Sequence, residues 1–139
     1  MFGIIISGHG HYASGVYSSM ELILGEQNNV SIVDFPQTDT KTELENNIQN
    51  AIKQFENEEH ILICCDLLSG SPFNVSIMEA MKDSRIKVLY GVNIGMLLEI
   101  LVNRNMGQSF EQICSNIVET GKSQIGFFDC SLVDDDDDF

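Results

Sequence analysis

The sequence predicts an α/β fold: a single doubly wound, mostly parallel sheet with helices on both faces and a short C-terminal edge strand. Near-continuous apolar runs of strand length recur along the chain, as in strands that are buried on both faces. Amphipathic segments with helix-start signals separate these runs. The length of 139 residues suits one domain with a real core.

The first half of the chain is expected to supply two strand–helix pairs. Residues 2–7 form a continuous apolar run, and residues 13–24 carry a helical apolar stripe that ends at Gly25. Residues 30–35 predict the second strand. The pattern Thr-Lys-Thr-Glu at 40–43 is a capping box, so it predicts the start of the next helix.

The second half continues the alternation. Ser71 is expected to be the N-cap of a helix, with Pro72 at its first helical position. The other predicted elements are strands at 60–65 and 86–90, a helix over 94–102, a helix capped at 109 and ending at 121, and an edge strand of either direction at 124–129.

Charge and composition exclude several classes of function. Seven basic and 21 acidic residues give a net charge of −14, which argues against nucleic acid and anionic membranes as partners. Five consecutive aspartates, 134–138, predict a disordered acidic tail over 131–139, after one domain at 1–130. No apolar run approaches the roughly 18–20 residues of a membrane span, and no signal peptide is visible, so a cytoplasmic protein is expected.

The four cysteines are expected to be reduced thiols. They show no C-x-x-C spacing, and Cys64 and Cys65 lie inside an apolar run where burial is the simplest prediction. The sequence offers no ligand set for zinc, so no metal is predicted.

The turn after the first strand allows two interpretations. Gly8-x-Gly10-x-x-Ala13 has the spacing of a dinucleotide-binding turn, and Asp34 ends the second strand where a ribose-binding acid is expected. However, 139 residues leave no substrate domain, and His9 stands where a pyrophosphate would need to approach bare backbone.

The second interpretation makes His9 a nucleophile for phosphorus. A neutral imidazole can attack through one nitrogen if the other donates its proton to a carboxylate. Asp66 ends the third strand, which neighbours the first in the common flavodoxin-like order. His9 and Asp66 are therefore expected to meet at the carboxyl edge of the sheet.

A phosphoryl group on His9 would need donors for its oxygens. Ser69, Gly70 and Ser71 lead into a predicted helix N-terminus, which is a natural anion site, and Ser71 adds a hydroxyl. His11 also follows the first strand and Asn93 follows the fourth, and both are candidates for the rim of the site. His60 follows two glutamates and fits an ordinary surface residue, so we assign it no role.

These residues carry a resemblance to the IIA component of the mannose-type (mannose–fructose–sorbose) sugar phosphotransferase system. It covers nearly the whole chain. The matching stretches are IIISGHG at 4–10, ELILGEQNNV at 21–30, the pattern D-x-x-x-G-S-P-F-N at 66–74, and G-V-N-x-x-M-L at 91–97. The resemblance implies that His9 is the phosphorylated histidine, that Asp66 pairs with it and that Ser71 contacts the phosphoryl group. Gly8, Gly10, Ser69 and Gly70 would supply the backbone around that group.

The resemblance also implies partners. Such proteins accept phosphate from the carrier protein HPr and pass it to a histidine of a IIB component, without a cofactor and with only indirect contact with the membrane through the permease. They are homodimers in which a C-terminal strand adds to the partner's sheet. No Ala/Pro-rich linker to a fused IIB follows, so a free-standing IIA is expected.

Two departures and two alternatives qualify this resemblance. Ser7-Gly8 stands where many relatives have Gly-Thr, and Leu67-Leu68 replaces the Thr-Trp of some members. A phosphocarrier for a dihydroxyacetone kinase and a nucleotide-binding module remain open, and the chain does not specify the sugar.

Overall fold

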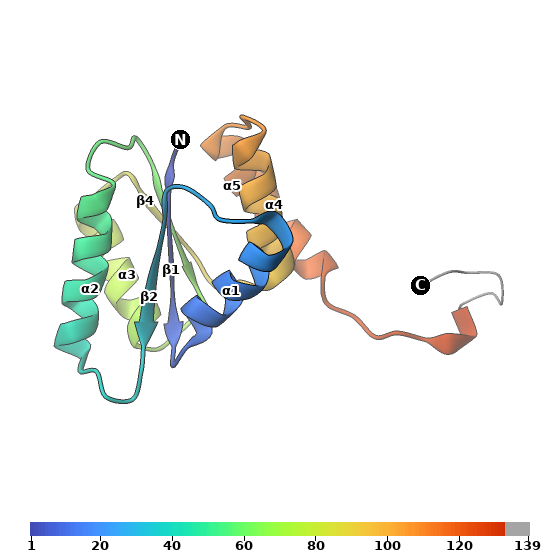
Figure 1. Cartoon of the computed structure of the whole chain (residues 1–139), viewed down its shortest axis with the longest axis horizontal. Helices are drawn as coiled ribbons and strands as arrows, with labels where there is room; N and C mark the ends of the chain where they lie inside the picture. The colour runs from blue at the N-terminus through green and yellow to red at the C-terminus, as the bar shows by residue number, and fades with distance from the viewer. Residues whose placement is uncertain (133–139) are drawn as a thin grey trace.

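The computed structural model describes residues 1–132, which form one parallel sheet with helices on both faces (Figure 1). The strands are β1 (Gly3–His9), β2 (Val30–Phe35), β3 (Ile61–Cys65) and β4 (Ile86–Leu89). They lie in the order β2-β1-β3-β4, and each neighbouring pair is parallel. This confirms the predicted doubly wound sheet and places β1 beside β3.

The helices cover both faces of the sheet. They are α1 (Tyr12–Leu24), α2 (Lys41–Gln54), α3 (Ser71–Lys82), α4 (Ile94–Asn105) and α5 (Phe110–Ser123). Helices α2 and α3 pack on one face, and α1, α4 and α5 pack on the other (Figure 1). Ile4 and Ile6 of β1 belong to the core under the second group, whereas Ile5 belongs to the core under the first. Burial on both faces explains why β1 is a continuous apolar run.

The predicted helix starts are confirmed at two positions. The Thr40 hydroxyl accepts the backbone N–H of Glu43 at 3.2 Å, and the Glu43 carboxylate accepts the Thr40 N–H at 3.3 Å, which completes the capping box. The Ser109 hydroxyl accepts the N–H of Gln112 at 3.2 Å and caps α5 in the same manner.

The predicted start of α3 is wrong by one residue. The helix begins at Ser71, and its N-cap is Gly70, with φ 95° and ψ 173°. Only glycine adopts this conformation readily. Gly70 adopts it where the His9 ring packs directly against its backbone, so a contact between two distant segments accompanies the shifted boundary.

The predicted edge strand at 124–129 does not form in the single chain. Gln124 is the C-cap of α5, and residues 125–129 have no regular structure before a short 3-10 helix, η1 (Cys130–Leu132). Beyond α5 the chain runs away from the sheet (Figure 1). A strand needs backbone hydrogen bonds to a neighbouring strand, and no strand within residues 1–132 pairs with this segment.

The predicted acidic tail falls mostly on residues 133–139, which lie outside the described residues. Ser131 and Leu132, at its start, belong to η1. Within residues 1–132, no helix is both long enough and apolar enough to cross a membrane.

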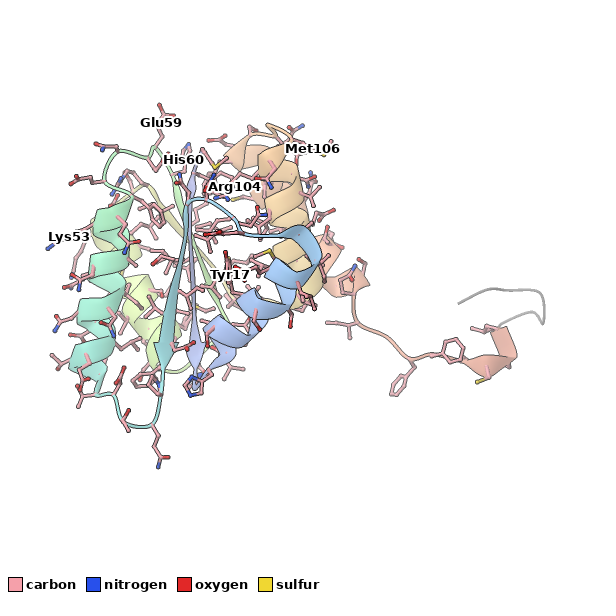
Figure 2. All side chains as sticks on the ribbon, in the orientation of Figure 1. Tyr17, Lys53, Glu59, His60, Arg104 and Met106 are labelled. Atoms are coloured by element: carbon pink, nitrogen blue, oxygen red, sulfur yellow. The ribbon has the colours of Figure 1, made fainter. Side chains whose placement is uncertain are left out.

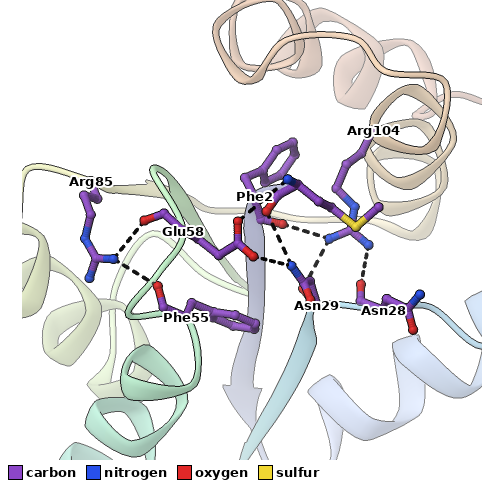
Figure 3. A network of polar contacts seen from close by, with 8 residues as sticks. Phe2, Asn28, Asn29, Phe55, Glu58, Arg85 and Arg104 are labelled. Carbon is purple, nitrogen blue, oxygen red and sulfur yellow. Dashed lines mark hydrogen bonds and ion pairs between the residues drawn. The ribbon is translucent and has the colours of Figure 1, made fainter.

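Two arginines hold the amino ends of the strands together (Figure 3). Arg104 of α4 is 5% exposed and donates to the carbonyls of Phe2, Asn28 and Asn29, which joins α4 to β1 and β2. Arg85 donates to carbonyls of the loop between α2 and β3. His60 lies at this same end (Figure 2), stacked on a phenylalanine ring of α5, so it is far from the carboxyl edge. These contacts have a structural role at the amino ends of the strands, and the predicted site residues lie at the opposite, carboxyl edge of the sheet.

Candidate functional site

The predicted site residues meet at the carboxyl edge of the sheet. His9 is the last residue of β1, and Asp66 directly follows β3, the strand paired with β1. Gly70 and Ser71 form the amino end of α3, which starts a few residues after Asp66. The parallel pairing of β1 with β3 therefore brings His9 beside Asp66 and the start of α3, which lie more than fifty residues later in the sequence.

The Asp66 carboxylate holds His9 in place. One of its oxygens, Oδ2, lies 2.9 Å from His9 Nδ1 and also accepts the His9 backbone N–H at 3.0 Å. The other oxygen, Oδ1, accepts the Leu67 backbone N–H at 2.9 Å. A carboxylate can only accept, so this arrangement assigns the ring proton to Nδ1 and leaves a lone pair on Nε2.

The unprotonated nitrogen of His9 faces the amino end of α3. A Cβ placed on Gly70 would lie 2.7 Å from both Nε2 and Cε1 of the ring. The His9 side chain is 44% exposed, so a docking partner can reach it. The first N–H groups of a helix have no intrahelical acceptor, and the helix dipole adds positive potential there. A phosphoryl group on Nε2 would lie at an anion-binding helix terminus.

The serines that precede and begin α3 are available for such a group. Ser69 is exposed and Ser71 is half-buried. Among the described residues, the Ser71 hydroxyl makes no hydrogen bond, and because Gly70 is the N-cap, that hydroxyl is not used to cap the helix.

Gly8 and Gly10, the two glycines of the turn after β1, are required for different reasons. Gly8 lies against Asp66 and Tyr12, because an added Cβ would be 2.9 Å from Asp66 Cγ and would overlap Tyr12 Cδ1. Gly10 has φ 59°, where glycine is favoured, and a Cβ there would meet nothing within 4 Å.

A second histidine–carboxylate pair lies on the β2 side of the turn. His11 Nδ1 is 3.3 Å from Asp34 Oδ2, and the His11 side chain is 80% exposed. Asp34 also accepts the Ser14 N–H at 2.9 Å and the Ser14 hydroxyl at 2.6 Å. Burial opposes ionisation of Asp34, but these hydrogen bonds outweigh it and lower its pKa.

Asp34 is thus the cap of α1, supplied from a neighbouring strand. His11 occupies the N-cap position but makes no side-chain cap. The Asp34 carboxylate therefore occupies the helix end where a dinucleotide would place its pyrophosphate, and both its oxygens are engaged. This geometry disfavours the nucleotide-binding interpretation.

Asn93 is not brought to His9. Its side-chain oxygen accepts the Met96 N–H at 3.0 Å and caps α4, and its amide donates to the Gly121 carbonyl at 3.1 Å. The oxygen of this side chain therefore caps α4, and its amide nitrogen joins the start of α4 to α5. Within residues 1–132, no group of three or more histidine, cysteine or acidic side chains is arranged to hold a metal ion.

Sequence reasoning missed two structural features beside the predicted site, the cap supplied by Asp34 and the packing of Tyr12 on Gly8. The capping role of Asp34 had a signal, since α1 begins without a Ser, Thr, Asp or Asn at its N-cap. Tyr12 gave no signal, because an aromatic residue at a helix start is usually core.

Comparisons with known proteins identify the family of the chain. The chain matches the sequence model of the PTS system fructose IIA component over residues 3–118. It is 30% identical over 136 residues to the fructose-specific EIIA component of Bacillus subtilis (strain 168), covering 88% of this chain and 93% of that one. It is 33% identical over 116 residues to the sorbose-specific EIIA component of Lacticaseibacillus casei, covering 84% and 83%.

A third relative is longer than this chain. The mannose-specific EIIAB component of Escherichia coli (strain K12) is 31% identical over 122 residues, and the match spans 88% of this chain but 38% of that protein. Among solved structures, the EIIA component from Streptococcus agalactiae has a TM-score of 0.82 and 32% identity, covering 91% of this chain and 97% of the other. The chain therefore belongs to the mannose-type IIA family of the sugar phosphotransferase system.

Proposed function

We propose that this protein is a cytoplasmic phosphocarrier, which accepts a phosphoryl group from phospho-HPr on His9 and passes it to a histidine of a IIB component. The observation that carries this proposal is the His9 ring itself. Its Nδ1 bonds to Asp66 at 2.9 Å, and its Nε2 faces the amino end of α3. One nitrogen is thereby oriented for attack while the other holds the proton.

In this reaction the lone pair of His9 Nε2 attacks the phosphorus of the donor's phosphohistidine. The donor's N–P bond breaks as the new one forms, and the donor imidazole leaves with the electron pair. The Nδ1 proton stays in the hydrogen bond to Asp66, whose negative charge offsets the positive charge developing on the ring. The N–H groups at the start of α3 and the Ser71 hydroxyl would bind the phosphoryl oxygens.

The relatives support the role but not a particular sugar. Their names specify fructose, sorbose and mannose. Because the three relatives carry three sugar names at similar identity, likeness to them favours the IIA role alone.

Phosphorylation can be tested with phosphoenolpyruvate, enzyme I and HPr, followed by intact-mass measurement. We expect one phosphoryl group on the wild type and none on His9→Ala. His60→Gln is the matched control, because His60 is also paired with a carboxylate, Glu111, at 3.2 Å but lies at the other end of the sheet. A mass gain that persists in His9→Ala would refute the proposal.

The acceptor separates the remaining alternatives. Phosphate should pass from the phosphorylated protein to IIB. Transfer to a kinase-bound nucleotide instead would favour the dihydroxyacetone kinase alternative. Titration with NAD should show no saturable binding, because the Asp34 carboxylate occupies the start of α1.

We also propose a homodimer in which the segment after α5 adds a strand to the partner's sheet. β4 is an edge strand, and a groove of about 280 Å³ beside it is lined by Val88, Leu89, Tyr90 and Ile125 among others. The segment exposes large apolar side chains, including Ile125 at 77% and Phe127 at 104%. Such exposure favours an intermolecular contact.

Light scattering of truncated chains tests the dimer. A chain that ends at Gln124 should be monomeric. A chain that ends at Leu132 keeps the apolar segment without the acidic tail and should remain a dimer. A dimer of the shorter chain would exclude strand addition as the basis of assembly.

A further inference from the structure

We propose that Tyr12 is a positioning residue of the phosphoryl-transfer site. Through a hydrogen bond to the loop between β4 and α4, Tyr12 keeps the Asp66 carboxylate within hydrogen-bonding distance of His9. This inference rests on the proposed function, since it assigns a residue to the same reaction. Tyr12 is the first residue of α1 and does not touch the reacting nitrogen.

The Tyr12 side chain packs beside the carboxylate that orients His9. Its ring and the Asp66 carboxylate lie against the same face of Gly8, because a Cβ added there would overlap Tyr12 Cδ1 and lie 2.9 Å from Asp66 Cγ. Glycine at position 8 therefore permits the two groups to approach each other beneath the His9 backbone.

The Tyr12 hydroxyl connects this contact to the strand that carries Asp66. It donates to the Val92 carbonyl, and the Val92 N–H donates to the Cys65 carbonyl at 3.1 Å. Cys65 ends β3 and immediately precedes Asp66. The contacts form a closed ring: Tyr12 to Val92, Val92 to Cys65, Asp66 to His9, and Gly8 back to Tyr12.

The closed ring limits two movements that would separate Asp66 from His9. Without the hydroxyl bond, the β4–α4 loop would lose its hydrogen bond to α1, and the tyrosine ring would lose the contact that fixes its angle beside Asp66. Burial raises the pKa of the Tyr12 hydroxyl, and the nearby Cys64 and Asp66 side chains raise it further. The phenol therefore keeps its proton and remains a donor.

The test compares two variants that each remove one hydroxyl from α1. Tyr12→Phe deletes the bond to Val92 and keeps the ring. Tyr17→Phe is the matched control, because the Tyr17 hydroxyl also makes one hydrogen bond, accepting the Gln27 N–H at 3.3 Å, and its ring packs on the same core. Tyr17 lies farther along α1, away from the carboxyl edge (Figure 2).

Two measurements are made on both variants. We expect the rate of phosphoryl transfer from phospho-HPr to fall roughly two- to tenfold in Tyr12→Phe, the factor that corresponds to one ordinary hydrogen bond. Nitrogen-15 NMR of the neutral His9 ring should show more of the tautomer with the proton on Nε2, because Asp66 holds Nδ1–H less firmly. Tyr17→Phe should match the wild type in both.

The NMR measurement needs no phosphate donor, so it separates this inference from the proposed function. If the wild type is not phosphorylated, the proposed function fails, and the tautomer ratio still reports whether Tyr12 positions His9. Wild-type transfer rates in Tyr12→Phe, or slower transfer with an unchanged tautomer ratio, would overturn the positioning role.

Discussion

The contact between Gly70 and His9 makes the sharpest prediction about the site. Gly70 has φ 95° and ψ 173°, and a Cβ there would lie 2.7 Å from His9 Nε2, closer than real Cβ contacts allow. Alanine at this position must push the imidazole away from the start of α3. The change therefore tests whether the reaction depends on that juxtaposition.

Two effects of Gly70→Ala can be separated in size. The backbone conformation costs a residue other than glycine about 1–3 kcal/mol, which corresponds to a fall in melting temperature of about 3–10 °C for a chain of this length. Displacement of a reacting group by about 1 Å costs roughly 100-fold in rate. We therefore expect a modest loss of stability and a much larger loss of phosphorylation rate.

Gly25→Ala is the matched control for the backbone effect. Gly25 has φ 81° and ψ 179°, nearly the same conformation, but a Cβ there would meet nothing within 4 Å. Both variants should melt at lower temperature, whereas only Gly70→Ala should be phosphorylated slowly in the HPr assay. If Gly70→Ala is phosphorylated as fast as Gly25→Ala, the attacking nitrogen does not work at the amino end of α3.

Three further predictions concern the carboxylates and the charge. Asp66→Asn should slow transfer by roughly 10²–10⁴-fold, because an amide no longer enforces the proton on Nδ1; unchanged transfer kinetics would remove Asp66 from the site. Asp34→Ala should destabilise the fold at pH 7 by about 1–2 kcal/mol, because α1 loses its cap. Folding lowers the pKa of Asp34, so the stabilisation is complete above the ordinary aspartate pKa of about 3.9. It is lost as the pH falls through the lower pKa of the folded state. The melting temperatures of variant and wild type should therefore converge as the pH falls below about 4. A net charge of −14 should speed docking of a partner with a basic surface, so phosphorylation should slow as ionic strength rises, and a rate insensitive to salt would exclude such steering.

Much of the fold follows from local patterns. The apolar runs and helical stripes predicted four strands and five helices in their observed order, and the boundaries of β2 matched at 30–35. The capping box at Thr40 and the cap at Ser109 were predictable because they involve residues three positions apart. The adjacency of β1 and β3 followed from the common order of such sheets, and it correctly joined His9 to Asp66.

The errors arose where a distant contact decides the conformation. Ser71 matches a local N-cap pattern, but the glycine before it takes that position where the His9 ring, some sixty residues earlier, packs against it. Residues 124–129 have a strand-like composition, yet they pair with no strand of the sheet in the single chain.

The sequence by itself determined the order of the elements and the residue types at the carboxyl edge, because periodicity and caps act over a few residues. The pairing of His9 with Asp66 was predictable only through the common strand order of such sheets. Only the tertiary structure decided which nitrogen of His9 is available, which carboxylate caps α1 and how Tyr12 connects α1 to the loop between β4 and α4. These features depend on atoms within about 3 Å of each other from separate segments, so no local pattern encodes them.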